Sequence, residues 1–503
     1  MNIKRFLALS IAALMLLPLL ASCGSGEGST VTTTADPSAV TEAQPTEEGA
    51  TEAVVELKPN IPETNDFGGY EFKALVRGEA DTVWMSRDIK ADEETGEAIN
   101  DAVYTRNKYV EELLNVKIIG IYDTTANNTA AGVKKVIMAG TNEWDIIMPK
   151  GTNLGAMITG DLLQDLRTVP YLDLTQPWWD EGVTRDWSLG GKVYVACGDI
   201  TITPNNANRI IMFNKKMIKD FGLDDPYTLV RENKWTLEKF HEMSRNVAND
   251  ENGDGKFDIE DRYGYLVQAG ITVNMFYGTG ENMTVKDAND MPVMSLNTDR
   301  SLEALTKINN ILAEPNAIMF DTDYSAAFPE GPEHALQQVF EANRGLFFAE
   351  VMQLTERMRA TNVEFGILPV PKLDENQDKY YTFADSWCMT GVTIPVTNTE
   401  LERTGIILEA MASKAKYTLT PAYYTQSLEG KFFRDEESRE MLDIIIGSRI
   451  VSLDEMFGWG MQTAIQDTFR KLTGGFTSVL ESKKGAAEAK MQKTIDAINA
   501  MGV

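Results

Sequence analysis

The residues whose types and spacing are best suited to chemistry form an acidic stretch in the middle of the chain. Residues 250–261, DENGDGKFDIED, place oxygen-bearing side chains at the first, third, fifth, ninth and twelfth positions and glycine at the sixth. This is the spacing of an EF-hand-type calcium loop, because a hard cation needs six or seven oxygen ligands and the glycine permits the turn that brings them inward. The expected calcium ligands are Asp250, Asn252, Asp254, Asp258 and Asp261, with the carbonyl oxygen of Lys256.

The last position of this loop departs from the usual pattern. Asp261 stands where a longer, bidentate Glu is usual, so the affinity and the metal preference stay open. The alternative is a solvated acidic turn that binds no metal. Because the loop lies between a predicted helix and a predicted strand at 263–267, we expect calcium to have a structural role, and we expect no catalytic cofactor.

Side chains for nucleophilic or zinc catalysis are scarce. The chain has two histidines, His241 and His334, and neither lies beside a nucleophile motif. No HExxH motif or pair of CxxC motifs occurs, so zinc is unsupported. A glycoside hydrolase needs only two carboxylates, and 75 acidic residues always supply such pairs. The net charge of −28 argues against a nucleic-acid partner, because phosphate backbones would be repelled.

The first 23 residues carry the signals of export. Lys4 and Arg5 precede an apolar run, residues 6–20, that is too short to span a membrane comfortably. The following LASC motif resembles the lipobox of a bacterial lipoprotein signal peptide, in which Cys23 would be lipidated; a simple secretory signal with an incidental cysteine is the alternative. Residues 24–60 are rich in Ser, Thr and Glu, which predicts a disordered tether. We expect a lipid-anchored protein on the extracellular face of the cell membrane.

Beyond the tether, strand and helix patterns alternate. Strands are predicted at 70–76 and 116–121, with a helix between them, and residues 143–148 have the continuous apolar pattern of a buried parallel strand. This order predicts an α/β fold. A chain of 503 residues exceeds one ordinary domain, so two domains are expected.

The segment 192–240 connects these two domains in our interpretation. Its pattern predicts a strand at 193–195, a break at Pro204–Asn206 and a second strand at 210–213. A short helix follows, and Thr236 is suited to cap the next one. The chain is therefore expected to leave one domain at the break and to enter the other.

Three pieces of this segment, GKVYVACGD, IIMFNKKMIKDFGLDDPY and KWTLEKF, carry a family resemblance. They resemble the bacterial extracellular solute-binding proteins of family 1, the carbohydrate-binding group of ABC importer receptors that includes maltose-binding protein. The resemblance implies a two-lobe, type II periplasmic-binding-protein-like α/β fold with hinge crossovers between the lobes. Lobe 1 would comprise 61–200 with about 383–445; lobe 2 would comprise 201–382 with about 446–503, including the calcium-type loop.

The resemblance also implies a function. The protein would capture a solute, a sugar or an oligosaccharide, between its lobes, close over it by hinge motion and deliver it to an ABC transporter permease. We expect a monomer that is not an enzyme. The alternatives are a receptor for a peptide or another non-sugar solute on the same fold, and a secreted carbohydrate-active enzyme.

Candidate ligand contacts follow from the positions that match the cleft segments of the family. Trp459, in the FGWG run, matches an aromatic sugar platform, with a buried core tryptophan as the alternative. Each of the others has ordinary packing or turn formation as its alternative. The candidate residues are Asp81, Trp84, Lys150, Asn153, Glu350, Trp387 and Trp459.

Two further pairs of residues remain open at this point. Trp178 and Trp179 could form a sugar platform, although packing of their loop is favoured. Cys197 and Cys388 could form a disulfide bond or remain buried thiols, because their separation in space is not known from the sequence.

Overall fold

The computed structural model describes residues 56–78, 84–125, 128–328, 331, 333–358, 360–428 and 436–501. The predicted signal peptide, most of the tether and two candidate residues, Cys23 and Asp81, lie outside these ranges. Residues from Glu56 onward form one unit of the chain. Within the described ranges, no helix has the length and apolar character needed to cross a membrane.

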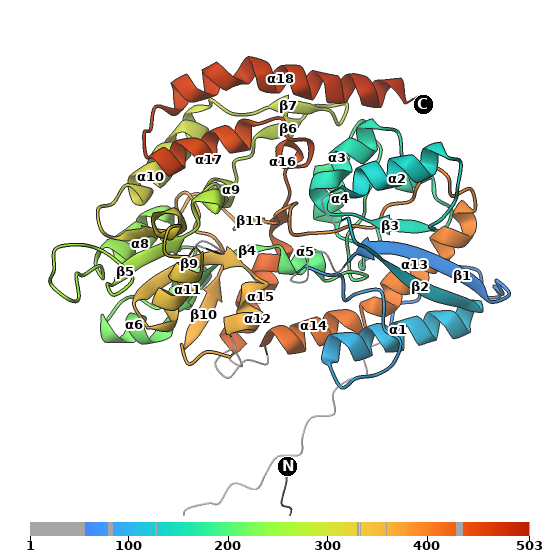
Figure 1. Ribbon diagram of the computed structural model, residues 1–503, viewed down its shortest axis with the longest axis horizontal. Coiled ribbons are helices and arrows are strands. Elements are labelled where there is room, and N and C mark those ends of the chain that lie inside the picture. Colours follow the sequence, from blue (N-terminus) through green and yellow to red (C-terminus); the bar gives the residue numbers. More distant parts are fainter. Residues whose placement is uncertain are drawn as a thin grey trace, which may run out of the picture. The chain divides into compact units, whose positions relative to one another are not determined.

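The first lobe is built on a parallel sheet in the order β2-β1-β3 (Figure 1). Its strands are β1 (Tyr70–Arg77), β2 (Val116–Asp123) and β3 (Ile146–Met148). Successive side chains of β1 point into different cores, one on each face of the sheet. Val76 packs with residues of α1 (Ala98–Leu114) and α13 (Leu401–Ala415). Leu75 packs with residues of α2 (Thr129–Met138) and α3 (Gly151–Thr159). Helices on both faces explain why β3 is apolar throughout and why Ala74–Val76 of β1 are buried on both faces.

The second lobe contains a mixed sheet in the order β10-β4-β9-β5-β8 (Figure 1). Strand β9 pairs in parallel with β5 and antiparallel with β4. The strands are β4 (Arg209–Asn214), β5 (Tyr263–Val267), β8 (Ile318–Phe320), β9 (Gly345–Val351) and β10 (Phe365–Leu368). The helices α8 (Leu237–Arg245), α10 (Asp299–Leu312), α11 (Glu333–Glu341) and α15 (Glu436–Gly447) contribute to the core around this sheet. The predicted cap is confirmed, because the Thr236 side chain accepts a hydrogen bond from the Lys239 amide.

The remaining elements lie between and beside these sheets. They are α4 (Glu181–Trp187), α5 (Thr203–Asn206), α6 (Lys215–Asp220), α7 (Pro226–Arg231), α9 (Asn274–Gly278), the hairpin of β6 (Thr284–Lys286) and β7 (Pro292–Met294), α12 (Leu354–Met358), α14 (Leu419–Leu428), α16 (Leu453–Phe457) and α17 (Met461–Lys471). Helix α18 (Phe476–Ala500) packs against both α17 and α3.

The chain passes between the lobes in segments that lie beside one another. Strand β11 (Thr382–Phe383) pairs in parallel with β12 (Arg449–Ile450), and Asn208, just before β4, bridges to Ala384. These contacts place the start of β4 next to residues 384–389, which we call the strap. The polar site described below lies around this junction.

Two boundaries differ from the sequence predictions. Residues 193–195 form no strand, because their segment meets its antiparallel neighbour only at the isolated bridge between Ala196 and Val392. Residues up to about 445 are predicted to belong to lobe 1, but Met441 and Ile445 of α15 are buried in the core of the second sheet, and the helix packs against β10.

Candidate functional site

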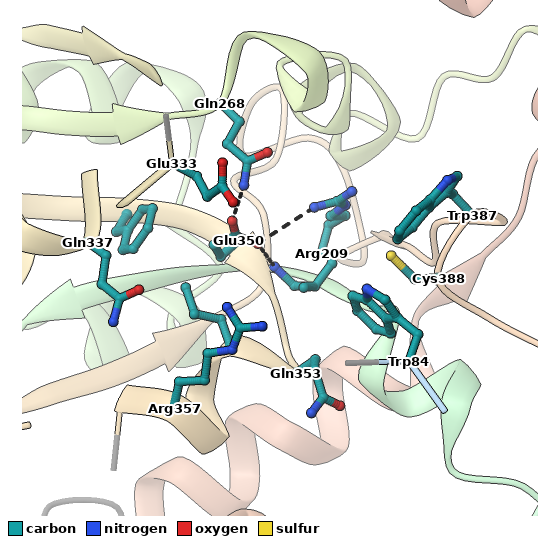
Figure 2. Close-up of a pocket in the computed structure, with 13 residues that line it drawn as sticks. Trp84, Arg209, Gln268, Glu333, Gln337, Glu350, Gln353, Arg357, Trp387 and Cys388 are labelled. Atoms are coloured by element: carbon teal, nitrogen blue, oxygen red, sulfur yellow. Dashed lines mark hydrogen bonds and ion pairs between the residues drawn. The ribbon is translucent and has the colours of Figure 1, made fainter. Parts of the chain in front are cut away.

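A cavity of about 420 Å³ lies beside the start of β4, the end of β9 and the strap (Figure 2). Its lining combines two tryptophans with guanidinium, amide and carboxylate groups. A cavity of this size and mixed lining is typical of a small-molecule site. The chain brings these groups together from segments that are far apart in sequence.

Two tryptophans form one wall of the cavity. Trp84 follows β1, Trp387 belongs to the strap, and their rings meet edge to face with centroids 6.1 Å apart. Trp387 is 44% exposed, whereas Trp84 is half-buried. The Nζ of Lys150 lies 4.1 Å from the Trp387 ring centre and the Arg77 guanidinium lies 5.2 Å from it. These cation–π contacts hold the ring while much of its surface remains available.

The opposite side of the cavity is polar and centres on Glu350 of β9. One oxygen of its carboxylate accepts a hydrogen bond from the Gln268 side-chain amide, and the other accepts from the Val351 N–H at 2.8 Å. The Arg209 guanidinium lies 3.8 Å from Glu350. Burial raises the pKa of Glu350, and Arg209 opposes this shift. Figure 2 shows Arg209 between Glu350 and the tryptophan wall.

A second carboxylate, Asp385, ties the strap to Arg209. Arg209 forms an ion pair with Asp385, whose other oxygen accepts from the Trp387 N–H at 2.8 Å. The next residue of the strap, Ser386, donates its N–H to Glu455 of α16 at 2.8 Å. Burial, and then the charge of Asp385, raise the pKa of Glu455 to about 8.

An ion pair also joins the lobes near the cavity. Arg87, on the segment that follows Trp84, lies 2.9 Å from Glu356 of α12. The side-chain amide of Gln353, which lines the cavity, donates to the other oxygen of Glu356 at 3.0 Å. The segment that carries Trp84 is therefore held against the second lobe.

Some of the candidate residues that the structure describes line this cavity, and others do not. Trp84, Glu350 and Trp387 line it, and Lys150 contacts the Trp387 ring. Asn153 is not among the lining residues; it is buried on α3, where its side-chain oxygen accepts from the Ala130 N–H at 3.5 Å.

Trp459 occupies a different environment from the one predicted. Its side chain is 2% exposed, stacks on Phe457 at a centroid distance of 5.4 Å and donates its indole N–H to Thr494 at 3.1 Å. The ring lies in a core between α16 and α18 and does not line the cavity. This buried position leaves no open aromatic face for a sugar.

Several lining residues were not found from the sequence. Arg209 had a usable signal, because a charged residue at the start of an apolar strand must be neutralised inside the fold. Gln268, Gln337 and Arg357 had none, because their approach depends on how β5, α11 and α12 are packed.

The other open pairs are also placed. Trp178 and Trp179 are buried, and both donate their indole N–H groups to Glu409 at 3.0 Å, so the packing alternative is confirmed. Cys197 and Cys388 are free buried thiols, and Cys388 lines the cavity.

The acidic loop is closed by its own hydrogen bonds. Asp261 is buried, and its carboxylate accepts from the Glu251 and Asp258 amides at 2.8 Å each. The Asp250 carboxylate accepts from the Gly253 and Gly255 amides at 2.6 and 2.8 Å. Among the described residues, no group of three or more His, Cys, Asp or Glu side chains is arranged to hold a metal ion. Calcium binding by this loop stays a prediction.

Comparison with known proteins agrees with this architecture. Residues 90–333 match the family model of bacterial extracellular solute-binding proteins. This match, over just under half of the chain, and the two-lobe fold bear out the resemblance to bacterial extracellular solute-binding proteins that was stated from the sequence. A search of curated proteins found no match.

Solved structures of the same fold cover most of the chain. A cyclo/maltodextrin-binding protein complexed with maltotetraose has a TM-score of 0.54 and 13% identity over 84% of this chain and 97% of that one. The GacH receptor of Streptomyces glaucescens has a TM-score of 0.52 and 12% identity over 85% and 99%. A cyclic alpha-maltosyl-1,6-maltose binding protein from Arthrobacter globiformis has a TM-score of 0.53 and 14% identity over 86% and 99%. These matches confirm the predicted type II α/β fold.

Proposed function

We propose that this protein captures a saccharide in the cavity beside the strap and delivers it to an ABC importer. The observation that carries the proposal is the exposed ring of Trp387, which shares one cavity with Glu350, Gln268 and Arg209. Saccharides present C–H faces that pack on aromatic rings and hydroxyl groups that bond to carboxylate, amide and guanidinium groups. The cavity offers both kinds of partner from the same small volume.

The relatives support the same ligand class. The cyclo/maltodextrin-binding protein was solved with maltotetraose, and the GacH receptor was solved unliganded and with acarbose. Delivery of the solute to a membrane permease is the role of the matched family. A monomer with one cleft is sufficient for this task.

Isothermal titration of the full-length chain tests the ligand class. We expect maltotetraose or a related oligosaccharide to bind with 1:1 stoichiometry and to raise the melting temperature by mass action. Short peptides and amino acids form the matched comparison. Binding of a peptide and of no saccharide would keep the fold and overturn the ligand class.

The same samples separate a receptor from an enzyme. Glu333 and Glu350 both line the cavity, and a pair of carboxylates is the minimum equipment of a glycoside hydrolase. We expect the bound saccharide to be recovered intact after prolonged incubation. Cleavage products that disappear in a Glu350→Gln variant would establish a hydrolase instead.

We also propose that Cys23 is lipidated and anchors the protein to the outer face of the cell membrane. The support is the LASC motif after the short apolar segment. Cells that express the protein should incorporate labelled fatty acid into the wild type and not into Cys23→Ser. Equal release of both proteins into the medium would contradict the anchor.

A structural calcium ion in the 250–261 loop is the remaining proposal from the motif. Its support is the ligand spacing and the positive φ of Gly255, which turns the loop inward. Calcium should raise the melting temperature, a chelator should reverse the rise, and Asp254→Ala should remove the response. Asp220→Ala, at an exposed position of α6, is the control. An identical melting curve with calcium and with chelator would exclude the ion.

A further inference from the structure

Arg209 lies where the aromatic and polar sides of the cavity meet. It is the first residue of β4, and it is only 7% exposed. A guanidinium at this depth requires opposite charges, because transfer from water is otherwise too costly. Two carboxylates from distant parts of the chain provide them, one on β9 and the other on the strap.

The two carboxylates have different tasks in the cavity. Glu350 belongs to the polar side, where it is also held by Gln268 and by the Val351 N–H. Asp385 uses one oxygen for Arg209 and the other for the Trp387 N–H. A continuous chain of contacts therefore runs from Glu350 through Arg209 and Asp385 to the backbone of Trp387. Figure 2 shows its first link, between Glu350 and Arg209.

We propose that Arg209 is a positioning residue that fixes the Trp387 wall relative to the Glu350 carboxylate. The inference rests on the proposed function only where saccharide affinity is concerned; the placement of Trp387 is independent of any ligand. The planar, forked guanidinium meets two carboxylates at once. A lysine ammonium keeps the charge, but it is a point charge on a flexible stem and does not reproduce this bridge.

Neighbouring buried groups make the position of the strap depend more strongly on Arg209. Glu455 lies beneath the strap and accepts the Ser386 N–H, so another carboxylate is buried close to Asp385. A lysine at position 209 cannot bridge both carboxylates, so one of them would lose its buried countercharge. The strap would then move Asp385, and with it Trp387, toward water.

The test measures the exposure of Trp387 without any ligand. Acrylamide quenching of tryptophan fluorescence is recorded for the wild type and for Arg209→Lys, each with and without Trp387→Phe. The difference between the two measurements of each pair gives the quenching of Trp387 alone. We expect Arg209→Lys to raise the quenching constant of Trp387 about twofold or more. Asp385→Asn should raise it as well, because the ion pair is lost while an acceptor for the Trp387 N–H remains.

Two arginines serve as controls. Arg106 on α1 is fully buried and hydrogen-bonded to the Asp88 and Ile200 carbonyl oxygens, away from the cavity. Arg231 bridges Glu437 and Glu440 on the protein surface. Arg106→Lys controls for loss of buried packing and Arg231→Lys for loss of a bridging guanidinium. Neither should change the quenching of Trp387.

The outcomes decide between positioning and general stability. If Arg209→Lys lowers the melting temperature as Arg106→Lys does and leaves Trp387 quenching unchanged, the inference is overturned. If Arg209→Lys does not fold, unchanged quenching in Asp385→Asn overturns it in the same way. Where the wild type binds maltotetraose, we expect Arg209→Lys to weaken binding by about tenfold or more. A wild type that binds no saccharide refutes the proposed function, while the quenching result still decides the role of Arg209.

Discussion

Two pairs of tryptophans in this protein have opposite surroundings. Trp84 and Trp387 meet edge to face at the cavity, where the cations Arg77 and Lys150 lie against the Trp387 ring. Trp178 and Trp179 are buried in the first lobe. The first pair uses its π faces and keeps exposed surface, whereas the second uses its N–H groups and is almost fully buried.

The difference follows from the partner of each pair. A cation over a ring holds the ring from one side, so another face remains available for a ligand. A carboxylate that accepts two indole N–H groups draws both rings into the core, and here that carboxylate is Glu409, which is 1% exposed. Tryptophan is therefore a platform at the cavity and a structural support in the first lobe.

The largest expected effect belongs to the buried pair. Trp178→Ala should lower the free energy of unfolding by about 3–5 kcal/mol, because it creates a large cavity in the core. It also leaves Glu409 with one indole donor fewer. Urea denaturation followed by circular dichroism measures the loss. Saccharide affinity of the folded fraction should stay at the wild-type value, and a loss of affinity without a loss of stability would reverse the comparison.

The next effect is a pH dependence that comes from Glu409. Burial raises its pKa from 4.5 to about 7, against the lowering effect of the indole donors. Between these values the unfolded chain binds fewer protons than the folded protein at this group. Its contribution therefore makes the free energy of unfolding fall as the pH rises from about 4.5 to about 7, by at most about 1.4 kcal/mol per pH unit.

Melting curves across this pH range measure the contribution of Glu409. Glu409→Gln cannot titrate, so its stability should fall less steeply with pH than that of the wild type. Glu402→Gln, in the first turn of the same helix, is the control and should keep the wild-type slope. Parallel curves for wild type and Glu409→Gln would show that the carboxylate is not held protonated by its surroundings.

A smaller effect is expected for the exposed Trp387, and it should change the free energy of saccharide binding. Trp387→Ala should weaken saccharide binding by about 2 kcal/mol, or roughly 30-fold, as is typical of an aromatic residue at the centre of a site. The unfolding free energy should change little, because much of the side chain is already in water. Calorimetric titration gives the affinity, and wild-type affinity in this variant would remove Trp387 from the site.

The smallest effect is expected for Trp84, which supports Trp387 edge to face. Trp84→Phe keeps an aromatic edge, so its affinity loss should be about 1 kcal/mol or less. In the Trp387→Ala background the same substitution should cost less still, because the ring that Trp84 supports is gone. Equal losses in both backgrounds would show that Trp84 contacts the ligand independently.

The sequence predicted most elements of the fold for local reasons. The apolar run of β3, the strand at 210–213 that lies within β4, and the cap at Thr236 depend on residues that are close together in the chain. The lobe of residues 436–445, which lie in α15, was not found from the sequence, because an amphipathic pattern shows that a face is buried and not which sheet buries it.

Residue types and their local order by themselves determined the α/β class, the tryptophans and carboxylates available for a site, and the export signal proposed for the first residues. Only the tertiary structure decided which of them share a cavity. Trp387 and Trp459 both stand in glycine- or serine-containing segments that suit a platform, yet one is exposed beside Arg209 and the other is stacked on Phe457. Exposure depends on which helices pack over a residue, and those helices come from sequence positions that no local pattern connects.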